Sequence, residues 1–144
     1  MISCDTNILV ACHRQDYGTH KQILKQLAAV LNKGTSVGIL WPCVQEFLAV
    51  VTNPRVFKRL SSLSLAFEFM ERLLQQKGVT CLYEKPGHMR TLREISLSPN
   101  TVSGKIHDAR IAAICLTNQV EELWTAKRDF SSFPRLKTFN PLTG

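Results

Sequence analysis

The feature that most constrains the fold is the alternation of short apolar runs with longer amphipathic segments along the chain. The short runs have the length of strands, and the amphipathic segments repeat apolar residues at the spacing of a helix. Strands that are separated by helices usually pair in parallel. The order therefore predicts an α/β fold with a short central, mostly parallel sheet flanked by helices.

Particular residues locate the expected elements. Thr19 is expected to cap the second helix, and Leu65, Phe69 and Leu73 are expected to form the apolar stripe of the fourth. The segment 96–105 contains Ser, Pro, Asn, Thr and Gly and is predicted to be a loop, and the helix after it is apolar on nearly every side. The predicted strands are 1–4, 36–40, 79–82, 122–125 and 136–139, and the predicted helices are 7–12, 19–32, 44–51, 64–76, 88–95 and 106–118.

Length and the absence of targeting signals bound the class of protein. A chain of 144 residues has the usual size of one domain, so a single hydrophobic core over residues 1–144 is expected. No apolar run approaches the ~20 residues that a membrane-spanning helix needs. The first residues lack a basic segment followed by an apolar stretch, so the expected location is the cytoplasm.

Charge and cysteine content narrow the expectation further. The chain carries 18 Lys and Arg against 11 Asp and Glu, and its net charge of +7 favours a polyanionic partner. Five cysteines form an odd set without a C-x-x-C pair, which disfavours a disulfide framework or a zinc site. Buried, reduced thiols are predicted instead, in agreement with a reducing compartment.

Four carboxylates lie where the backbone enters or leaves the expected core. Asp5 ends the first predicted strand, and Asp129 follows the fourth. Glu46 and Asp108 lie in the first turns of two predicted helices. Because the carboxyl ends of parallel strands share one edge of a sheet, all four side chains can converge there.

A converging set of carboxylates points to a metal site. Carboxylates that lie close together repel one another unless a cation compensates them. Oxygen ligands without converging His or Cys favour Mg²⁺ or Mn²⁺ over zinc. Taken singly, Asp5 and Asp108 could instead cap helices, and Glu46 could be a paired core carboxylate. The joint placement favours the metal site.

Four segments then resemble, in order along the chain, the motifs of the PIN-domain family, and in particular those of the VapC toxins of bacterial toxin–antitoxin pairs. No single segment is specific, but together they span nearly the whole chain. They are residues 4–9 (CDTNIL), 41–47 (WPCVQEF), 107–113 (HDARIAA) and 125–130 (TAKRDF), followed by Phe-Pro at 133–134 and Asn-Pro at 140–141.

The resemblance implies a single PIN domain over residues 1–144 that acts as a Mg²⁺-dependent endoribonuclease, with Mn²⁺ as a possible substitute. By matched positions, the catalytic acids are Asp5, Glu46, Asp108 and Asp129, of which Asp5 and Asp108 would be the principal metal ligands. The groups that the resemblance implies as orienting the carboxylates or water are Thr6, Asn7 and Thr125.

The resemblance also implies partners. These are RNA as substrate, a small VapB-like antitoxin that blocks the acidic groove, and a second copy in a homodimer. Apolar residues of the segment 60–69 are candidates for such contacts, with core packing as the ordinary alternative. The candidates for RNA phosphate contacts are Arg14, Arg55, Arg59, Arg110, Arg128 and Arg135.

One position departs from the family pattern. PIN domains usually have an acid two residues after the threonine of the closing segment, whereas this chain has Lys127. If Lys127 faces the acids, its ammonium could occupy the region of a second metal or contact substrate phosphate, and Lys127→Asp should strengthen Mn²⁺ binding. It could equally point to solvent. In either case a two-metal mechanism is in doubt.

Other classes fit the sequence less well. A phosphotransferase of the D-x-D-x-T type is disfavoured because Asp5 is followed by Thr6-Asn7. A receiver domain needs a phosphorylated Asp after a central strand, and none is evident in this sequence. A dinucleotide-binding module is disfavoured by the absence of G-x-G-x-x-G. The remaining alternative is a degenerate PIN domain that binds RNA or a partner without cleaving, and Lys127 keeps that alternative open.

Overall fold

The computed structural model describes residues 1–99 and 105–143. The strands of its sheet are β1 (Ile2–Cys4), β2 (Val37–Leu40), β3 (Val79–Leu82), β4 (Glu122–Trp124) and β5 (Thr138–Phe139). The helices are α1 (Thr6–His13), α2 (His20–Asn32), α3 (Trp41–Val51), α4 (Leu63–Gln75), α5 (His88–Ser96), α6 (Ile106–Thr117) and the short 3₁₀ helix η2 (Asp129–Ser132).

The five strands form one sheet in the order β3-β2-β1-β4-β5, and every neighbouring pair is parallel. The chain starts at the centre with β1, adds β2 and β3 on one side, and then returns to add β4 and β5 on the other. The strand order therefore reverses between β1 and β4. In open α/β sheets, ligands bind beyond the carboxyl ends of the strands at such a point. The predicted α/β class is confirmed.

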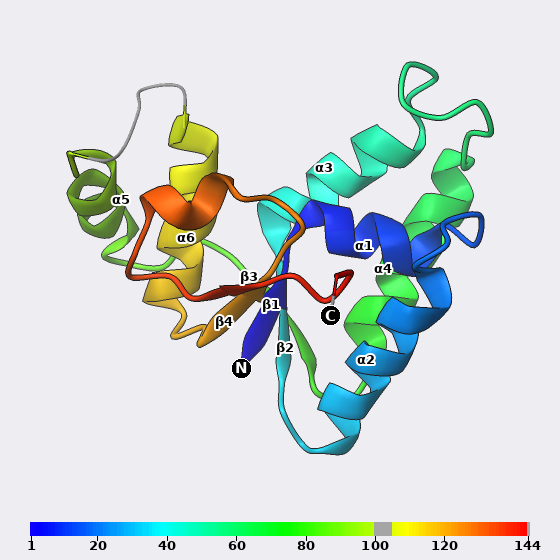
Figure 1. The fold of residues 1–144 in the computed structure, drawn as a ribbon, viewed down its shortest axis with the longest axis horizontal. Coiled ribbons are helices and arrows are strands. Elements are labelled where there is room, and N and C mark those ends of the chain that lie inside the picture. The colour runs from blue at the N-terminus through cyan, green and yellow to red at the C-terminus, as the bar shows by residue number, and fades with distance from the viewer. Residues whose placement is uncertain (100–104, 144) are drawn as a thin grey trace.

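Helices cover both faces of the sheet. Figure 1 shows α5 and α6 on one side of the strands and α1 to α4 on the other. Helix α6 packs against the sheet with five consecutive buried residues, 111–115, as its apolar circumference predicts. Within the described residues, no helix has both the length and the hydropathy that crossing a bilayer requires.

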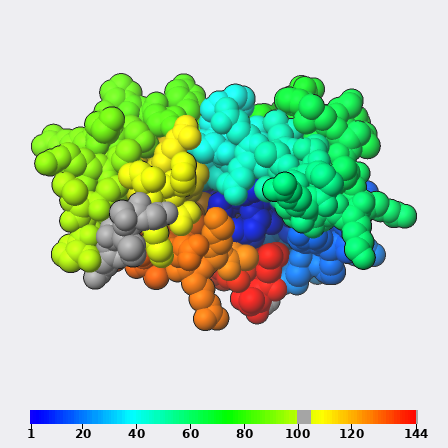
Figure 2. All heavy atoms as spheres, turned by 90° about the horizontal axis from the view of Figure 1, so that it is seen from above, coloured from blue at the N-terminus to red at the C-terminus, as the bar shows by residue number. Residues whose placement is uncertain are grey.

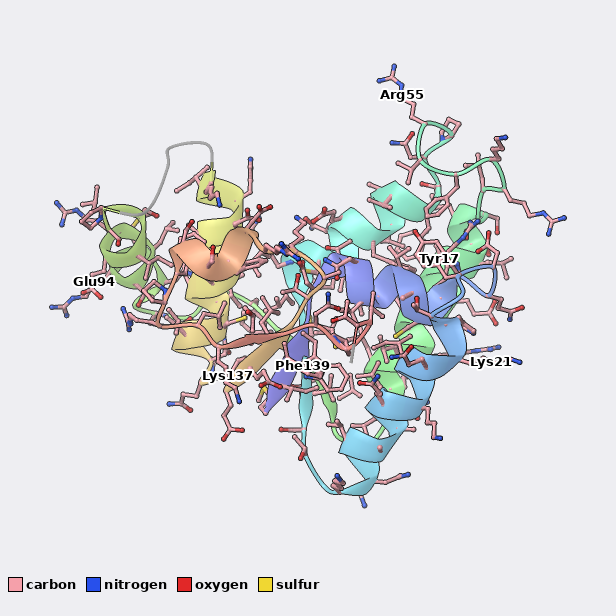
Figure 3. All side chains as sticks on the ribbon, in the orientation of Figure 1. Tyr17, Lys21, Arg55, Glu94, Lys137 and Phe139 are labelled. Carbon is pink, nitrogen blue, oxygen red and sulfur yellow. The ribbon has the colours of Figure 1, made fainter. Side chains whose placement is uncertain are left out.

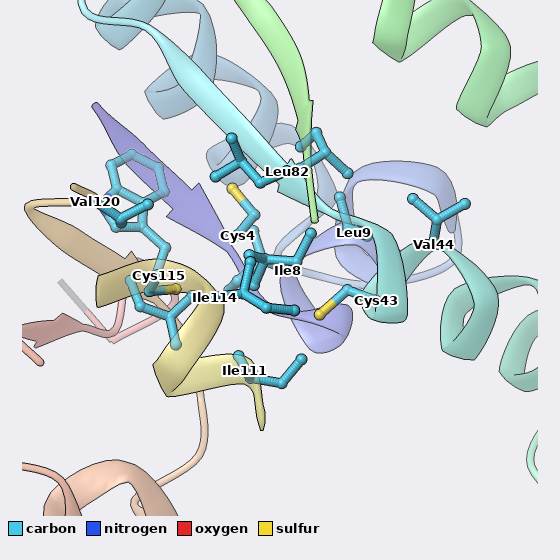
Figure 4. Packing of buried hydrophobic residues seen from close by; sticks show 14 of the residues in the cluster. Cys4, Ile8, Leu9, Cys43, Val44, Leu82, Ile111, Ile114, Cys115 and Val120 are labelled. Carbon is cyan, nitrogen blue, oxygen red and sulfur yellow. The ribbon is translucent and has the colours of Figure 1, made fainter. Parts of the chain in front are cut away.

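The core lies where β1, α1, α3 and α6 meet (Figure 4). Cys4, Ile8, Cys43 and Ile114 come from these four elements, and each is fully buried. All five cysteines are free thiols, as predicted, and only Cys81 is partly exposed. Burial raises the pKa of Cys12 to about 12, so this thiol stays protonated and unreactive at neutral pH.

The predicted stripe of α4 is partly wrong. Leu65 is 58% exposed, and the buried residues of the helix are Ala66 and Met70. Phe69 and Leu73 are partly buried against the same core. Residues 66, 69, 70 and 73 have the i, i+3, i+4, i+7 spacing of one helix face, and Leu65 lies one residue, or about 100°, to its side.

Some boundaries and caps also differ from the prediction. Helix α3 begins at Trp41 rather than 44, because Pro42 occupies the first turn, where a missing N–H costs no hydrogen bond. Thr19 precedes α2, but its backbone is already helical, and its side chain makes no capping hydrogen bond to the described helix. Helix η2 lies in a segment for which no helix was predicted. Of the predicted loop 96–105, residues 100–104 lie outside the described residues.

Candidate active site

Asp5 lies at the junction between β1 and α1, at the carboxyl edge of the sheet. The strand ends at Cys4 and the helix begins at Thr6, so Asp5 is its N-cap, and its Oδ1 accepts a hydrogen bond of 2.8 Å from the Thr6 backbone N–H. The side chain is buried, with 2% exposure. The positive end of the α1 dipole stabilises a carboxylate at this position.

Donors from α1, from α3 and from the segment after β4 surround the Asp5 carboxylate. Thr125 Oγ1 and Asn7 Nδ2 donate to its Oδ2 over 2.8 and 3.1 Å. The Cys43 thiol lies 3.7 Å from its Oδ1, and burial raises the pKa of this thiol, so its S–H can donate. Asn7 Oδ1 also accepts from the Ala126 backbone N–H at 2.9 Å. These bonds offset the desolvation of a buried charge and tie the end of β1 to the end of β4.

Glu46 reaches the same place from α3. Its Oε2 accepts a hydrogen bond of 3.0 Å from Thr6 Oγ1. Thr6 therefore donates to Asp5 with its backbone N–H and to Glu46 with its hydroxyl. Although its helix is rich in apolar residues, the Glu46 side chain is exposed. The alternative prediction, that Glu46 is a paired carboxylate buried in the core, is therefore wrong.

A cavity of about 390 Å³ brings three of the four predicted acids together. In Figure 2, which looks onto this edge of the sheet, the blue N-terminal segment is surrounded by α3 (cyan), α6 (yellow) and the segment after β4 (orange). Asp108 comes from the first turn of α6. The residues lining the cavity are Asp5, Pro42, Glu46, His107, Asp108, Arg110, Ile111 and Lys127.

Asp129, the fourth predicted acid, is not among the residues that line this cavity. It opens η2, and its side chain is 55% exposed. Its Oδ1 lies 4.0 Å from the Lys105 Nζ, which also donates to the Asp129 backbone carbonyl oxygen at 3.2 Å. Asp129 therefore anchors Lys105 at the start of α6.

Lys127 faces the acids, which resolves the two orientations that the sequence left open. Its Nζ lies 3.9 Å from Asp108 Oδ1, and its side chain is 42% exposed. Burial lowers the pKa of Lys127, but the negative charges of Asp5, Asp108 and Glu46 outweigh that effect and raise the pKa above its ordinary value. Lys127 is therefore an ammonium at neutral pH.

Arg110 provides a second basic group on the cavity wall. Its Nε donates to Glu84 Oε1 over 2.6 Å, which joins α6 to the segment after β3. Burial raises the pKa of Glu84, but a backbone hydrogen bond and the Arg110 guanidinium outweigh it and lower that pKa overall. Sequence reasoning gave Glu84 no function, since a residue just after a strand with basic neighbours resembles ordinary surface charge.

The other arginine candidates lie elsewhere. Arg14 is 7% exposed, pairs with Asp16 over 2.6 Å and stacks on the Phe57 ring at 4.0 Å, so it stabilises the fold and is not free to bind RNA. Arg55 projects from the tip of the connection after α3 (Figure 3). Arg135 pairs with Glu94 over 3.6 Å, and Arg59 lies in the connection between α3 and α4.

The donor set fits a hard divalent cation, with restrictions. Asp5, Glu46 and Asp108 offer only carboxylate oxygens, which Mg²⁺ and Mn²⁺ prefer, and the cavity has room for the waters that Mg²⁺ usually retains. Within residues 1–99 and 105–143, however, no three His, Cys, Asp or Glu side chains form a ready-made metal site. An ion at this place would need water as well as carboxylate oxygens among its ligands.

Comparison with known proteins identifies the family. The PIN domain family model matches residues 2–136. Ribonuclease VapC43 of Mycobacterium tuberculosis is 31% identical over 144 residues, which cover 100% of this chain and 97% of the relative. The chain belongs to the PIN-domain family of VapC ribonucleases. Ribonuclease VapC31 of the same species, a further VapC relative, is 28% identical over 98% of the chain and 99% of its own length.

Solved structures share the fold of this VapC family member. VapBC2 from Rickettsia felis, solved bound to a DNA fragment from its promoter, superposes with a TM-score of 0.72 at 16% identity, over 97% of this chain and 98% of that chain. VapC20 of Mycobacterium tuberculosis, described as a sarcin-ricin loop cleaving toxin, gives a TM-score of 0.65 at 14% identity, over 92% of this chain and 94% of that chain. These similarities show the PIN fold.

Thr125→Val should destabilise this VapC domain by about 1–3 kcal/mol, because the buried Asp5 carboxylate loses a donor and the Lys127 backbone N–H loses its acceptor at 3.1 Å. The measurement is urea denaturation followed by circular dichroism. Thr138→Val, at an exposed position of β5, is the matched control and should change the free energy of unfolding by less than about 0.5 kcal/mol. Equal effects of the two variants would contradict the assigned hydrogen bonds.

Proposed function

We propose that this VapC family member is a Mg²⁺-dependent endoribonuclease that hydrolyses RNA phosphodiester bonds, with Mn²⁺ as a substitute ion. The observation that carries the proposal is the meeting of Asp5, Glu46 and Asp108 on one cavity at the point where the strand order reverses. The three acids come from segments up to 103 residues apart in the chain, so their meeting is a property of the fold.

The proposed roles follow from the contacts of each side chain. Asp5 and Asp108 hold the ion, and Glu46 contributes directly or through a water. Thr6, Asn7 and Thr125 keep the Asp5 carboxylate in one orientation through their hydrogen bonds, as groups around a metal site do. When bound, the cation supplies charge stabilisation at phosphate oxygens and acidifies a bound water.

Asp129 is proposed to act from outside the cavity. The sequence pattern places it among the catalytic acids, but its side chain pairs with Lys105, so its contribution is to the charge around Lys127 and to the position of α6. It is not proposed as a ligand of the ion.

Positive charge near the cavity supports RNA as the substrate. Lys127 and Arg110 line the acidic cavity, and Lys127 also lines a neighbouring cavity of about 520 Å³ together with Arg128. Phosphates of a strand lying across both cavities would meet these cations, and the net charge of +7 draws a polyanion toward the protein. The basic groups that are proposed to contact phosphate are Arg110, Lys127 and Arg128.

The proposed partners follow those of related proteins. The structural neighbours include VapBC2 and FitAB, and both were solved bound to DNA fragments. We propose a VapB-like antitoxin that covers the acidic cavity, a homodimer, and action in the cytoplasm, where the five free thiols would stay reduced. Copurification with the product of the neighbouring gene tests the antitoxin.

Metal dependence is tested by incubating the purified chain with RNA in Mg²⁺, in Mn²⁺ and in EDTA. We expect cleavage in both metals, none in EDTA, and recovery when excess Mg²⁺ is added back. RNA binding by gel shift is measured in parallel. Binding without cleavage under every condition would favour the alternative of a degenerate, RNA-binding PIN domain and would overturn the nuclease proposal.

A further inference from the structure

Lys127 lies in the acidic cavity, at the position where the closing PIN motif that this sequence resembles has an acid. Its Nζ lies 3.9 Å from Asp108 Oδ1, and Asp5 and Glu46 line the same cavity. An ammonium has three donors and no lone pair, so it can bind carboxylate or phosphate oxygens but cannot bind a metal ion.

Hydrogen bonds around Asp5 hold the backbone at Lys127 and at the residue before it. The Lys127 N–H donates to Thr125 Oγ1 over 3.1 Å, and the preceding N–H, that of Ala126, donates to Asn7 Oδ1 over 2.9 Å. Thr125 and Asn7 both donate to Asp5. The side chain of residue 127 therefore starts beside the principal carboxylate, and its placement over the cavity follows from the same contacts that fix Asp5.

The remaining charges near the cavity are compensated by other partners. Arg110 is paired with Glu84 over 2.6 Å, and Asp129 with Lys105 over 4.0 Å. Among the Asp, Glu, Lys and Arg residues that line the cavity, three carboxylates, those of Asp5, Glu46 and Asp108, then face one ammonium. The excess of two negative charges matches one divalent ion. A fourth carboxylate in place of Lys127 would leave four negative charges, which match two divalent ions.

We propose that Lys127 is a built-in cation that takes the place of a second divalent ion, so that the cavity of this enzyme binds one ion where a carboxylate at position 127 would permit two. The proposal rests on the metal-dependent function proposed above. A second divalent ion within about 4 Å of the ammonium would meet strong repulsion in this half-buried place. During cleavage the ammonium would stand where substrate phosphate oxygens need positive charge.

The test is calorimetric titration of the purified chain with MnCl₂ alone, in the absence of RNA. We expect one binding site in the wild-type chain and two in Lys127→Asp. Lys127→Gln removes the charge without adding a ligand, so it should keep one site and bind Mn²⁺ tighter by roughly 10-fold. Electron paramagnetic resonance of the Mn²⁺-loaded Lys127→Asp chain should show a coupled pair of ions, as expected for ions ~4 Å apart.

Lys25→Asp is the control, because it makes the same charge change at an exposed position of α2 and should leave one site. Thermal melting confirms that each variant is folded. Two sites in the wild-type chain, or one site of unchanged affinity in both Lys127 variants, would overturn the inference and leave the nuclease proposal standing. No Mn²⁺ binding by the wild-type chain would overturn both.

Discussion

Asp108→Asn should lower the rate of RNA cleavage by more than the ~10–100-fold that loss of a group orienting a metal ligand typically costs. Asn keeps the size of the side chain but removes the negative charge that a divalent cation requires. Asp108 lies in the first turn of α6 with 20% of its side chain exposed, so the substitution should leave the fold intact. The measurement is the initial rate of cleavage of a labelled RNA at saturating Mg²⁺.

Asp129→Asn is the matched control for this prediction. It makes the same chemical change in the segment after β4, but the Asp129 side chain does not line the cavity and pairs with Lys105. We expect its effect on the cleavage rate to be less than about 10-fold, in the range of a group that acts only on an orienting contact. A loss in Asp129→Asn as large as that in Asp108→Asn would show that the fourth acid also reaches the ion.

The acids of the cavity could be predicted because each stands at the boundary of an element. Asp5 ends a strand, and Glu46 and Asp108 begin helices, so parallel topology alone brings them to one edge of the sheet. Asp129 satisfied the same rule and still lies outside the cavity. Parallel topology predicts at which edge of the sheet a residue lies. The direction of a side chain in a connecting segment depends on tertiary contacts, which topology does not predict.

Lys127 shows what such contacts decide. Its orientation depends on hydrogen bonds that Asn7 and Thr125 make across 118 residues of sequence. No local sequence pattern shows these hydrogen bonds, so the sequence left open whether the Lys127 side chain faces the acids or solvent. Arg14 shows the same limit for a basic residue, because its ion pair with Asp16 is local but its burial against Phe57 depends on the connection after α3.

Helix α4 shows the limit of periodicity. An apolar residue at nearly every position of its first turns permits several stripes, and the sequence does not say which of them faces the core. Ala66 and Met70 are the buried residues because α4 packs closely against α3 and β3. By contrast, α6 is apolar on nearly all sides, so its burial did not depend on choosing a face, and its prediction is confirmed.

Phe47→Ala should lower the free energy of unfolding by about 3–5 kcal/mol, the usual cost of removing a large aromatic side chain from a core. Phe47 is fully buried, and its ring lies 5.3 Å from the His13 ring and 5.4 Å from the Phe69 ring, measured between centroids. These three residues join α1, α3 and α4, so a cavity at Phe47 loosens all three helices. The measurement is urea denaturation followed by circular dichroism.

Phe67→Ala, which removes the same ring from a position that is 46% exposed on α4, is the control and should cost less than about 1 kcal/mol. Because Phe47 follows Glu46 on α3, its loss should also reduce Mn²⁺ affinity at temperatures where the variant is still folded. Calorimetric titration of both variants separates the two effects. Unchanged Mn²⁺ affinity in a destabilised Phe47→Ala chain would show that the packing of Phe47 does not influence the ion site.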